Sequence, residues 1–296
     1  MAERNIVITG PGRSGTTLAC HLLNKLPEAV AVNESIPPGK FADRLPDTAA
    51  VADGIQDFYR EQRRAALERG VVLTKHLGGV IPDNSKGMVD GVRRIVVEKG
   101  KIPVGKHLSP DFYFAVKQTG LFTAMLPDLA GRFACFAIVR NPLAIKASSL
   151  SLEPRAKRRA REHREGDERP RNPNARIRYD PGLDSRMQKR KGEGADAVDM
   201  WLLRMHANFE RYLEVLPPGH IVRYEDICES KGKALSVIVP AARGLDEPLE
   251  NKNLNPLYAG ERERVLHYGE RLLASEGAYW EFYTRESVEE IMDGLG

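Results

Sequence analysis

The stretch GPGRSGTT, residues 10–17, has the residue types and spacing of a phosphate-binding loop. It follows the outline GxxxxGK(S/T), in which backbone N–H groups and a helix start converge on an anion. Thr16 stands where that motif has its lysine, and Arg13 supplies a cation inside the loop instead. A guanidinium there suits a single terminal phosphate or sulfate better than a magnesium triphosphate. The loop alone predicts either anion binding by the N–H groups of residues 12–17 or a simple strand-to-helix turn.

A second group that could bind phosphate follows the apolar run Phe133–Val139. Arg140 comes directly after this predicted buried strand, and Ser148 lies about two turns into the next predicted helix. Both side chains can therefore face one phosphate. Taken singly, Arg140 is as well explained as a surface ion-pair residue, and Ser148 as an ordinary small helical residue.

The elements that must position these residues alternate between strands and helices. Short apolar runs predict strands at 5–10, 29–32, 112–116, 133–139 and 220–224, and either a strand or a buried turn at 71–74. Apolar spacings of three and four, or charged helical composition, predict helices at 16–26, 55–69, 88–99, 121–129, 142–150, 198–216, 261–275 and 286–295. This alternation predicts an α/β fold with a doubly wound, mostly parallel sheet flanked by helices, whose ligand lies beyond the carboxyl ends of the strands.

Bulk properties favour one soluble domain over residues 1–296. The net charge is +4, and the three cysteines are widely separated with no CxxC pair, which fits a reduced, cytoplasmic setting without a predicted metal site. No apolar run approaches the roughly 20 residues of a membrane span, and the start of the chain does not resemble a signal peptide.

Residues 153–195 have a different composition, with fourteen Lys/Arg against eight Asp/Glu and no sustained apolar period. Such a segment buries little surface and is expected to be a mobile excursion. Its basic run 155–164 is compatible with a solvated flap, a lid over the acceptor or nucleic-acid binding. Aromatic residues are almost absent, Tyr179 excepted, so no nucleic-acid partner is expected.

Three motifs together resemble the sulfotransferases that use 3′-phosphoadenosine 5′-phosphosulfate (PAPS). They are GPGRSGTTL, FAIVRNPLAIKASSL and HIVRYEDI, and their order and spacing match from residue 5 to about 230. The resemblance implies a P-loop, nucleotide-kinase-like fold in which Arg140 and Ser148 hold the 3′-phosphate of PAPS. It implies that the 5′-phosphosulfate is bound by the first loop, here Gly12, Arg13, Ser14, Gly15, Thr16 and Thr17. The family has Lys or Arg at the place of Arg13 and Thr at that of Thr16.

The catalytic residues that the resemblance implies are partly changed in this chain. Arg13 is the expected cation on the bridging oxygen, and Lys117, at the end of a predicted strand, is expected to steady the sulfuryl group. Many eukaryotic members have a histidine base two residues after that lysine, where this chain has Thr119. Bacterial relatives often have a glutamate after the second strand, which makes Glu34 the first candidate for the base. His76 and His107 are the competing candidates.

Two further features concern the C-terminal half. Glu225 and Asp226 are expected to organise the sheet end or to cap a helix, not to do chemistry. The Arg-Lys-Gly loop that covers the 3′-phosphate in some family members has no counterpart, because the RKG at 190–192 precedes the RYED motif. The polar segment 251–253 is the candidate to fill that place.

The expected function is therefore transfer of a sulfuryl group from PAPS, with adenosine 3′,5′-bisphosphate (PAP) as product, to a hydroxyl or amine. The acceptor is a small molecule, a carbohydrate or a lipid. The alternatives are a P-loop kinase of a small molecule, and a non-catalytic nucleotide-binding relative that has lost the base. No feature of the sequence indicates an oligomeric state.

Overall fold

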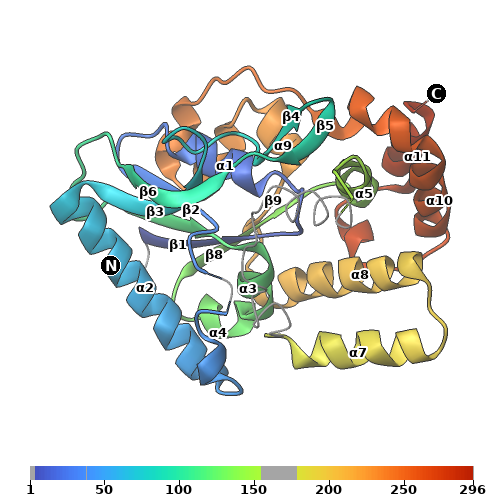
Figure 1. Ribbon diagram of the computed structural model, residues 1–296, viewed down its shortest axis with the longest axis horizontal. Helices are drawn as coiled ribbons and strands as arrows, with labels where there is room; N and C mark the ends of the chain where they lie inside the picture. Colours follow the sequence, from blue (N-terminus) through green and yellow to red (C-terminus); the bar gives the residue numbers. More distant parts are fainter. Residues whose placement is uncertain (1–3, 38, 155–178, 296) are drawn as a thin grey trace.

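The computed structural model describes residues 4–37, 39–154 and 179–295, and its centre is a parallel five-stranded sheet (Figure 1). The strand order is β2-β7-β1-β8-β9, and every neighbouring pair is parallel. The bounds are β1 Asn5–Thr9, β2 Ala29–Asn33, β7 Tyr113–Lys117, β8 Ala134–Val139 and β9 Ile221–Arg223. The predicted α/β class with a parallel sheet flanked by helices is confirmed.

The register brings the carboxyl ends of the strands to one edge. Lys117 pairs with both Ile8 and Asn33, and Thr9 pairs with Ala137. The inner strands β7, β1 and β8 consist mostly of buried apolar residues without alternation, which is the pattern of a parallel sheet covered by helices. Whatever follows β2, β1, β7 and β8 in the sequence therefore meets at the same edge.

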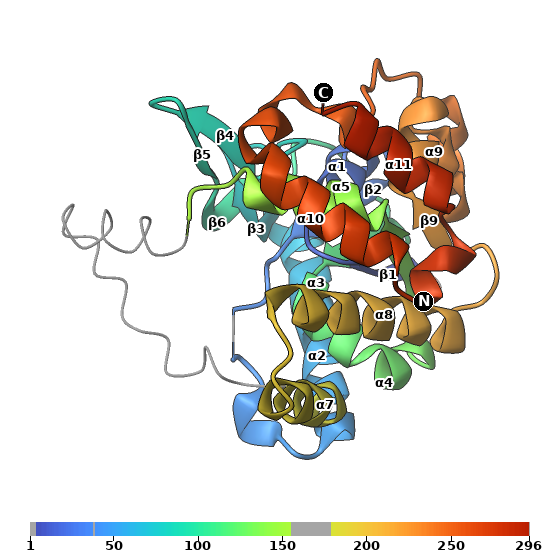
Figure 2. The same cartoon turned by 90° about the vertical axis from the view of Figure 1, so that its right-hand side faces the viewer.

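Helices cover both faces of the sheet and one of its ends. Figures 1 and 2 show α1 and α9 on one side and α2, α3 and α4 on the other, while α5, α10 and α11 pack against one another. The bounds are α1 Thr16–Leu23, α2 Thr48–Arg69, α3 Thr119–Ala124, α4 Leu126–Ala130, α5 Pro142–Leu150, α7 Pro181–Gly192, α8 Ala197–Val215, α9 Tyr224–Glu229, α10 Arg262–Leu273 and α11 Arg285–Asp293.

The helix predicted over 88–99 is wrong, because this region forms strands. Lys86–Val89 (β4) and Val92–Ile95 (β5) make an antiparallel hairpin, and Glu98–Pro103 (β6) pairs with Val71–His76 (β3). Asp90 and Gly91 form the turn of the hairpin with φ of 50° and 72°. An Asp-Gly pair between apolar residues is a strong hairpin signal, and it outweighs the helical spacing of the same residues.

The segment predicted as an excursion over 153–195 contains a helix that the sequence did not reveal. Residues 181–192 form α7, which Asp180 begins by accepting a hydrogen bond from the backbone N–H of Leu183 at 2.9 Å. α7 has no buried residue, so no apolar period could reveal it. The whole basic run 155–164, with the rest of 155–178, lies outside the described residues.

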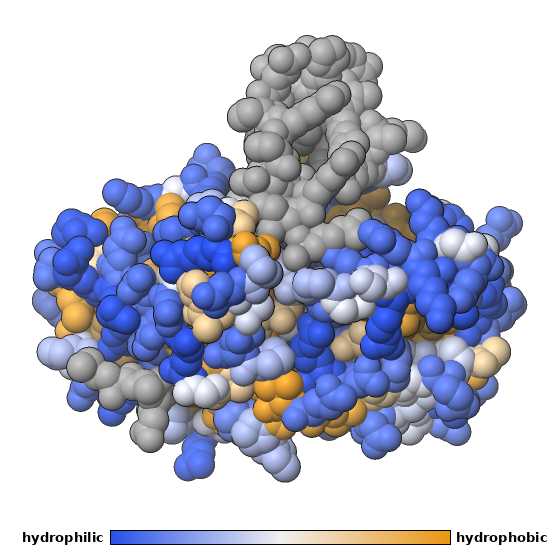
Figure 3. All heavy atoms as spheres, turned by 90° about the horizontal axis from the view of Figure 1, so that it is seen from below, coloured by the Kyte–Doolittle hydropathy of each residue, from blue (hydrophilic) through white to orange (hydrophobic). Residues whose placement is uncertain are grey.

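Most buried hydrophobic residues of the described ranges belong to one core. None of the helices there is long and apolar enough to cross a bilayer. The face seen from the α2, α4 and α7 side is mostly hydrophilic, with apolar residues in small separate groups (Figure 3). Apolar residues from β1 through α11 instead pack in one contiguous core.

Two glycines of the first loop provide a matched test of its backbone. A Cβ on Gly15, whose φ is 89°, would lie 2.5 Å from the ring of Tyr224, whereas a Cβ on Gly12 would have no heavy atom within 4 Å. We expect Gly15→Ala to lower the free energy of unfolding by about 1–3 kcal/mol, because both the dihedral and the ring oppose it. Gly12→Ala should change it by less than about 0.5 kcal/mol. Urea unfolding measures both, and equal losses would contradict this account of the loop.

Candidate functional site

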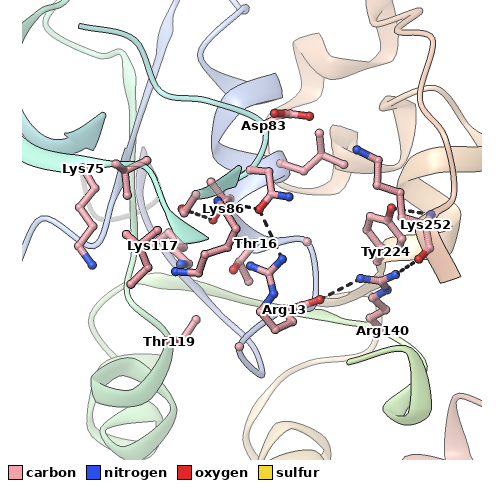
Figure 4. A pocket seen from close by; sticks show the side chains of 18 of the residues that line it. Arg13, Thr16, Lys75, Asp83, Lys86, Lys117, Thr119, Arg140, Tyr224 and Lys252 are labelled. Carbon is pink, nitrogen blue, oxygen red and sulfur yellow. Dashed lines mark hydrogen bonds between the residues drawn. The ribbon is translucent and has the colours of Figure 1, made fainter. Parts of the chain in front are cut away.

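A cavity of about 400 Å³ lies at the carboxyl edge of the sheet, above the loop between β1 and α1. Figure 4 shows Arg13 in the middle of it, with Lys75, Lys86 and Lys117 on one side and Arg140 and Lys252 on the other. Seven cationic side chains line the cavity: Arg13, Lys75, Lys86, Arg93, Lys117, Arg140 and Lys252. Three carboxylates accompany them: Glu34, Asp83 and Glu250. The excess of positive charge makes this a site for an anion.

The first loop holds a backbone conformation that few residues adopt. Arg13 has φ of 77° although it is not glycine, and such conformations concentrate at functional sites. Gly12, Gly15, Thr16 and Thr17, which the sequence named as candidates for anion binding, line the cavity. The loop residues thus face the space where an anion would lie.

Ser14 is the exception among the predicted loop residues. Its side chain is fully buried, and its hydroxyl donates to the carbonyl of Ile138 at 2.6 Å. The side chain therefore ties the loop to β8 and does not line the cavity.

Arg13 and Ser148, which the sequence assigned to opposite ends of the donor, are in direct contact. The Nε of Arg13 donates to the Oγ of Ser148 at 3.1 Å, and Arg93, from β5, donates to the same oxygen at 3.4 Å. The guanidinium of Arg140 donates to the backbone carbonyl of Arg13 at 3.2 Å. The two predicted phosphate-binding motifs therefore form one continuous group, although 135 residues separate Arg13 from Ser148.

Arg140 also joins the loop to the C-terminal part of the chain. Its Nε donates to Oδ1 of Asn253 at 2.8 Å, and another nitrogen donates to the carbonyl of Lys252. Its guanidinium stacks on the ring of Tyr224, 4.5 Å from the centroid. The segment 251–253, predicted to lie near the 3′-phosphate, is thus in contact with Arg140.

Glu225 organises this end of the sheet, as predicted. Its carboxylate accepts from the backbone N–H of Asn141 at 3.0 Å, from Asn253 at 2.9 Å and from the hydroxyl of Tyr283 at 3.1 Å. These bonds connect the end of β8 to the segment that contacts Arg140. Asp226 pairs instead with Arg223 near the surface.

The guanidinium groups beside the loop lack compensating charge. In the described part of the chain, Arg13, Arg93 and Arg140 bond only to neutral oxygens and form no ion pair with a carboxylate. Burial, followed by the charges of Arg93 and Arg140, lowers the pKa of Arg13 to about 10. Cations held together in this way indicate an anionic ligand.

Glu34 lies on the opposite side of the loop, between two lysines. Its carboxylate accepts from Lys117 at 2.9 Å and pairs with Lys75, and Lys117 also donates to Asn33. Burial acts to raise the pKa of Glu34, but the charges of Lys117 and Lys75 outweigh it and lower this pKa to about 2. Like Arg13, Glu34 has a positive φ, at 46°. The predicted pair Glu34 and Lys117 is therefore assembled at the cavity.

The two histidines that competed with Glu34 do not line this cavity. His76, at the end of β3, is buried and accepts at Nδ1 from the backbone N–H of Gly79 at 3.2 Å. His107 is exposed in the segment between β6 and β7. Thr119 does line the cavity, at the position of the family's histidine.

Sequence reasoning missed the residues that the two hairpins contribute. Lys75 comes from β3, Lys86 from β4 and Arg93 from β5, and all three line the cavity. Burial, and after it the charge of Arg13, lowers the pKa of Lys86 to about 8. The Asp90-Gly91 turn was the signal in the sequence that could have revealed Lys86 and Arg93, because it joins the two strands that carry them.

Comparisons with known proteins name no family for this chain. No family model matches the sequence, and no curated protein matches it. Within the described residues, no group of three or more His, Cys, Asp or Glu side chains is arranged to hold a metal ion.

The Glu34 ion pairs predict a pH dependence of stability. The pKa of Glu34 is lowered from 4.5 to about 2 on folding, so its contribution is complete above about pH 5 and is lost as the pH falls towards 2. We expect Glu34→Gln to reduce the free energy of unfolding by up to about 3 kcal/mol at pH 7 and by much less at pH 3. Chemical denaturation at several pH values measures this. Glu98→Gln, at an exposed position, is the control, and a difference that does not shrink with pH would contradict the ion pairing.

Proposed function

We propose that this protein transfers a sulfuryl group from PAPS to a hydroxyl or amine of an acceptor. One observation carries the proposal: three adjacent strands end in cations that no carboxylate in the described chain fully offsets. β1 leads into the loop of Arg13, β7 ends in Lys117, and β8 is followed by Arg140. A ligand with negative charge at two places fits this edge better than one with a single phosphate.

The donor would be held at both of its charged ends by residues already in contact. Arg140, Arg93 and Ser148 are the residues for the 3′-phosphate, and the backbone N–H groups of the loop and the start of α1 are those for the 5′ end. Ser148 itself is fully buried and does not line the cavity, so it would act through the two arginines whose hydrogen bonds it accepts. Bound PAPS would supply the sulfuryl group and a phosphate leaving group.

The transfer itself needs charge stabilisation and alignment. The acceptor oxygen forms a bond to sulfur as the bond from sulfur to the phosphate oxygen breaks, and the negative charge grows on that phosphate. Arg13 would neutralise this charge, and Lys117, which lines the same cavity, would hold the sulfuryl oxygens. Glu34 holds Lys117 in place through the 2.9 Å ion pair.

Glu34 is also the proposed acceptor of the proton. Of the three candidate bases, it alone lines the cavity. A carboxylate with a pKa near 2 is a weak base, but the hydroxyl proton becomes strongly acidic as the bond to sulfur forms. The proton therefore passes to Glu34 late in the transfer, once the acceptor hydroxyl has become more acidic than the Glu34 carboxyl group.

The kinase alternative is less well supported by the chemistry at the strand ends. A magnesium triphosphate site of the P-loop type uses the loop lysine and an aspartate near the loop to hold the metal. The two strands that flank β1 end here in Lys117 and Arg140, and the loop lysine is replaced by Thr16. The side chains at these strand ends are thus cations, whereas a magnesium ion would need carboxylates there.

A melting scan tests the donor assignment. PAP at a hundredfold excess over its dissociation constant should stabilise the fold by about 2.7 kcal/mol, and ATP with magnesium should stabilise it less. Arg140→Ala should remove most of the effect of PAP, whereas Arg186→Ala, on the exposed side of α7, should leave it unchanged. A larger rise in melting temperature with ATP and magnesium would favour the kinase.

Activity measurements separate the enzyme from a non-catalytic relative. With PAPS and a panel of hydroxyl and amine acceptors, we expect Glu34→Gln to lower kcat by about 10²–10⁴. His76→Gln and His107→Gln should each retain kcat within about threefold. Binding of PAP with no turnover in the wild-type protein would favour the binding module, and full activity of Glu34→Gln would reject Glu34 as the base.

A further inference from the structure

A second cavity, of about 530 Å³, lies on the other side of the first loop from the positive cavity. It is enclosed by α3, α7 and the middle of α8, and Figure 1 shows these helices on the same side of the sheet. The residues that line it include Gly10, Pro11, Gln118, Leu121, Leu183 and Asn208. The sequence did not predict this cavity, because α7 buries no residue and so has no apolar period that would reveal the helix.

The two cavities meet at the loop. Gly12 and Thr119 line both of them. Lys117, which is proposed to act on the sulfuryl group, precedes Thr119 by two residues, and Glu34, the proposed acceptor of the proton, is ion-paired with Lys117. A molecule in the second cavity would therefore have access to the reacting group of a donor in the first.

The second cavity differs from the first in charge. Its charged lining residues are two carboxylates and two arginines, and Asp180 forms an ion pair with Arg211. No excess of positive charge remains to attract an anion. An uncharged molecule suits these walls, while anions are drawn to the first cavity.

One polar atom in this region lacks a partner. The side-chain oxygen of Gln118 is buried and has no hydrogen-bond partner within the described residues, and Gln118 lines the second cavity. Buried acceptors of this kind are normally satisfied. If the side chain turns towards the cavity, a ligand hydroxyl that donates to this oxygen would satisfy it.

The other residues that line the second cavity indicate the chemical class of its ligand. The amides of Gln118 and Asn208 can both donate and accept, which matches hydroxyl groups. Tyr179, Leu183 and Met187 supply apolar surface beside them. The volume lies within the range of small-molecule sites.

We propose that the second cavity is the acceptor site and that it takes a neutral, hydroxyl-bearing molecule with an apolar face, of the size of a sugar glycoside. The role of this molecule as the acceptor rests on the proposed sulfuryl transfer. The binding of such a molecule to the cavity is independent of it.

The test uses two probes of the same shape and different charge. These are 4-nitrophenyl β-D-glucopyranoside, which is neutral, and 4-nitrophenyl β-D-glucuronide, which is an anion. Binding to the full chain, saturated with PAP, is measured by ligand-observed NMR. We expect the neutral glycoside to bind at least tenfold more tightly than the glucuronide.

Three variants locate the binding. Leu183→Trp, which fills the cavity, and Gln118→Leu, which removes the unpartnered oxygen, should each weaken binding of the glucoside at least tenfold. Leu213→Trp, at an exposed position of α8 outside the cavity, is the matched control and should leave binding unchanged. All three should keep the rise in melting temperature caused by PAP.

The outcomes separate this inference from the proposed function. Glucoside binding that Leu183→Trp does not affect, tighter binding of the glucuronide, or no binding of either probe would overturn the inference while the effect of PAP stands. Glucoside binding that depends on Leu183 in a protein that PAP does not stabilise would sustain the cavity as a binding site and reject the donor assignment.

Discussion

The site depends on positive charge held at the ends of parallel strands without enough negative charge to balance it. Arg13, Arg93 and Arg140 are kept together by neutral oxygens, chiefly the hydroxyl of Ser148 and backbone carbonyls. Neutral acceptors fix the direction of a guanidinium without cancelling its charge. The fold therefore bears a repulsion that an anionic ligand would relieve, and the rigid sheet edge is what makes this arrangement possible.

At the same edge of the sheet, Glu34 supplies negative charge between two lysines. One carboxylate between Lys75 and Lys117 fixes the positions of two ammonium groups and is itself held ionised by them. The stabilisation that orders these side chains also weakens Glu34 as a base. A site built in this way gains alignment of its cations at some cost in the driving force for proton transfer.

The sequence was sufficient for the sheet and for the residues directly after its inner strands. Buried strands have continuous apolar runs, and Arg13, Glu34, Lys117 and Arg140 each follow or end such a run, so their meeting at one edge follows from parallel pairing alone. The contributions of β4 and β5 were missed because the apolar residues of 88–99 are also spaced as in a helix, and that of β3 because 71–74 fitted either a strand or a buried turn. α7 was missed since it buries no residue, and the buried position of the Ser14 hydroxyl depends on a carbonyl 124 residues away.

The placement of charge also bears on how two different molecules would be kept apart. A donor with several negative charges is attracted to the cavity lined by seven cations, while the cavity beyond Gly12 and Thr119 has balanced charges and offers no such attraction. Electrostatics alone would then sort a charged donor from a neutral acceptor before either is recognised in detail. The loop between β1 and α1 lies between the two spaces, so its unusual backbone conformation would serve both the proposed binding of an anion and the division between the cavities.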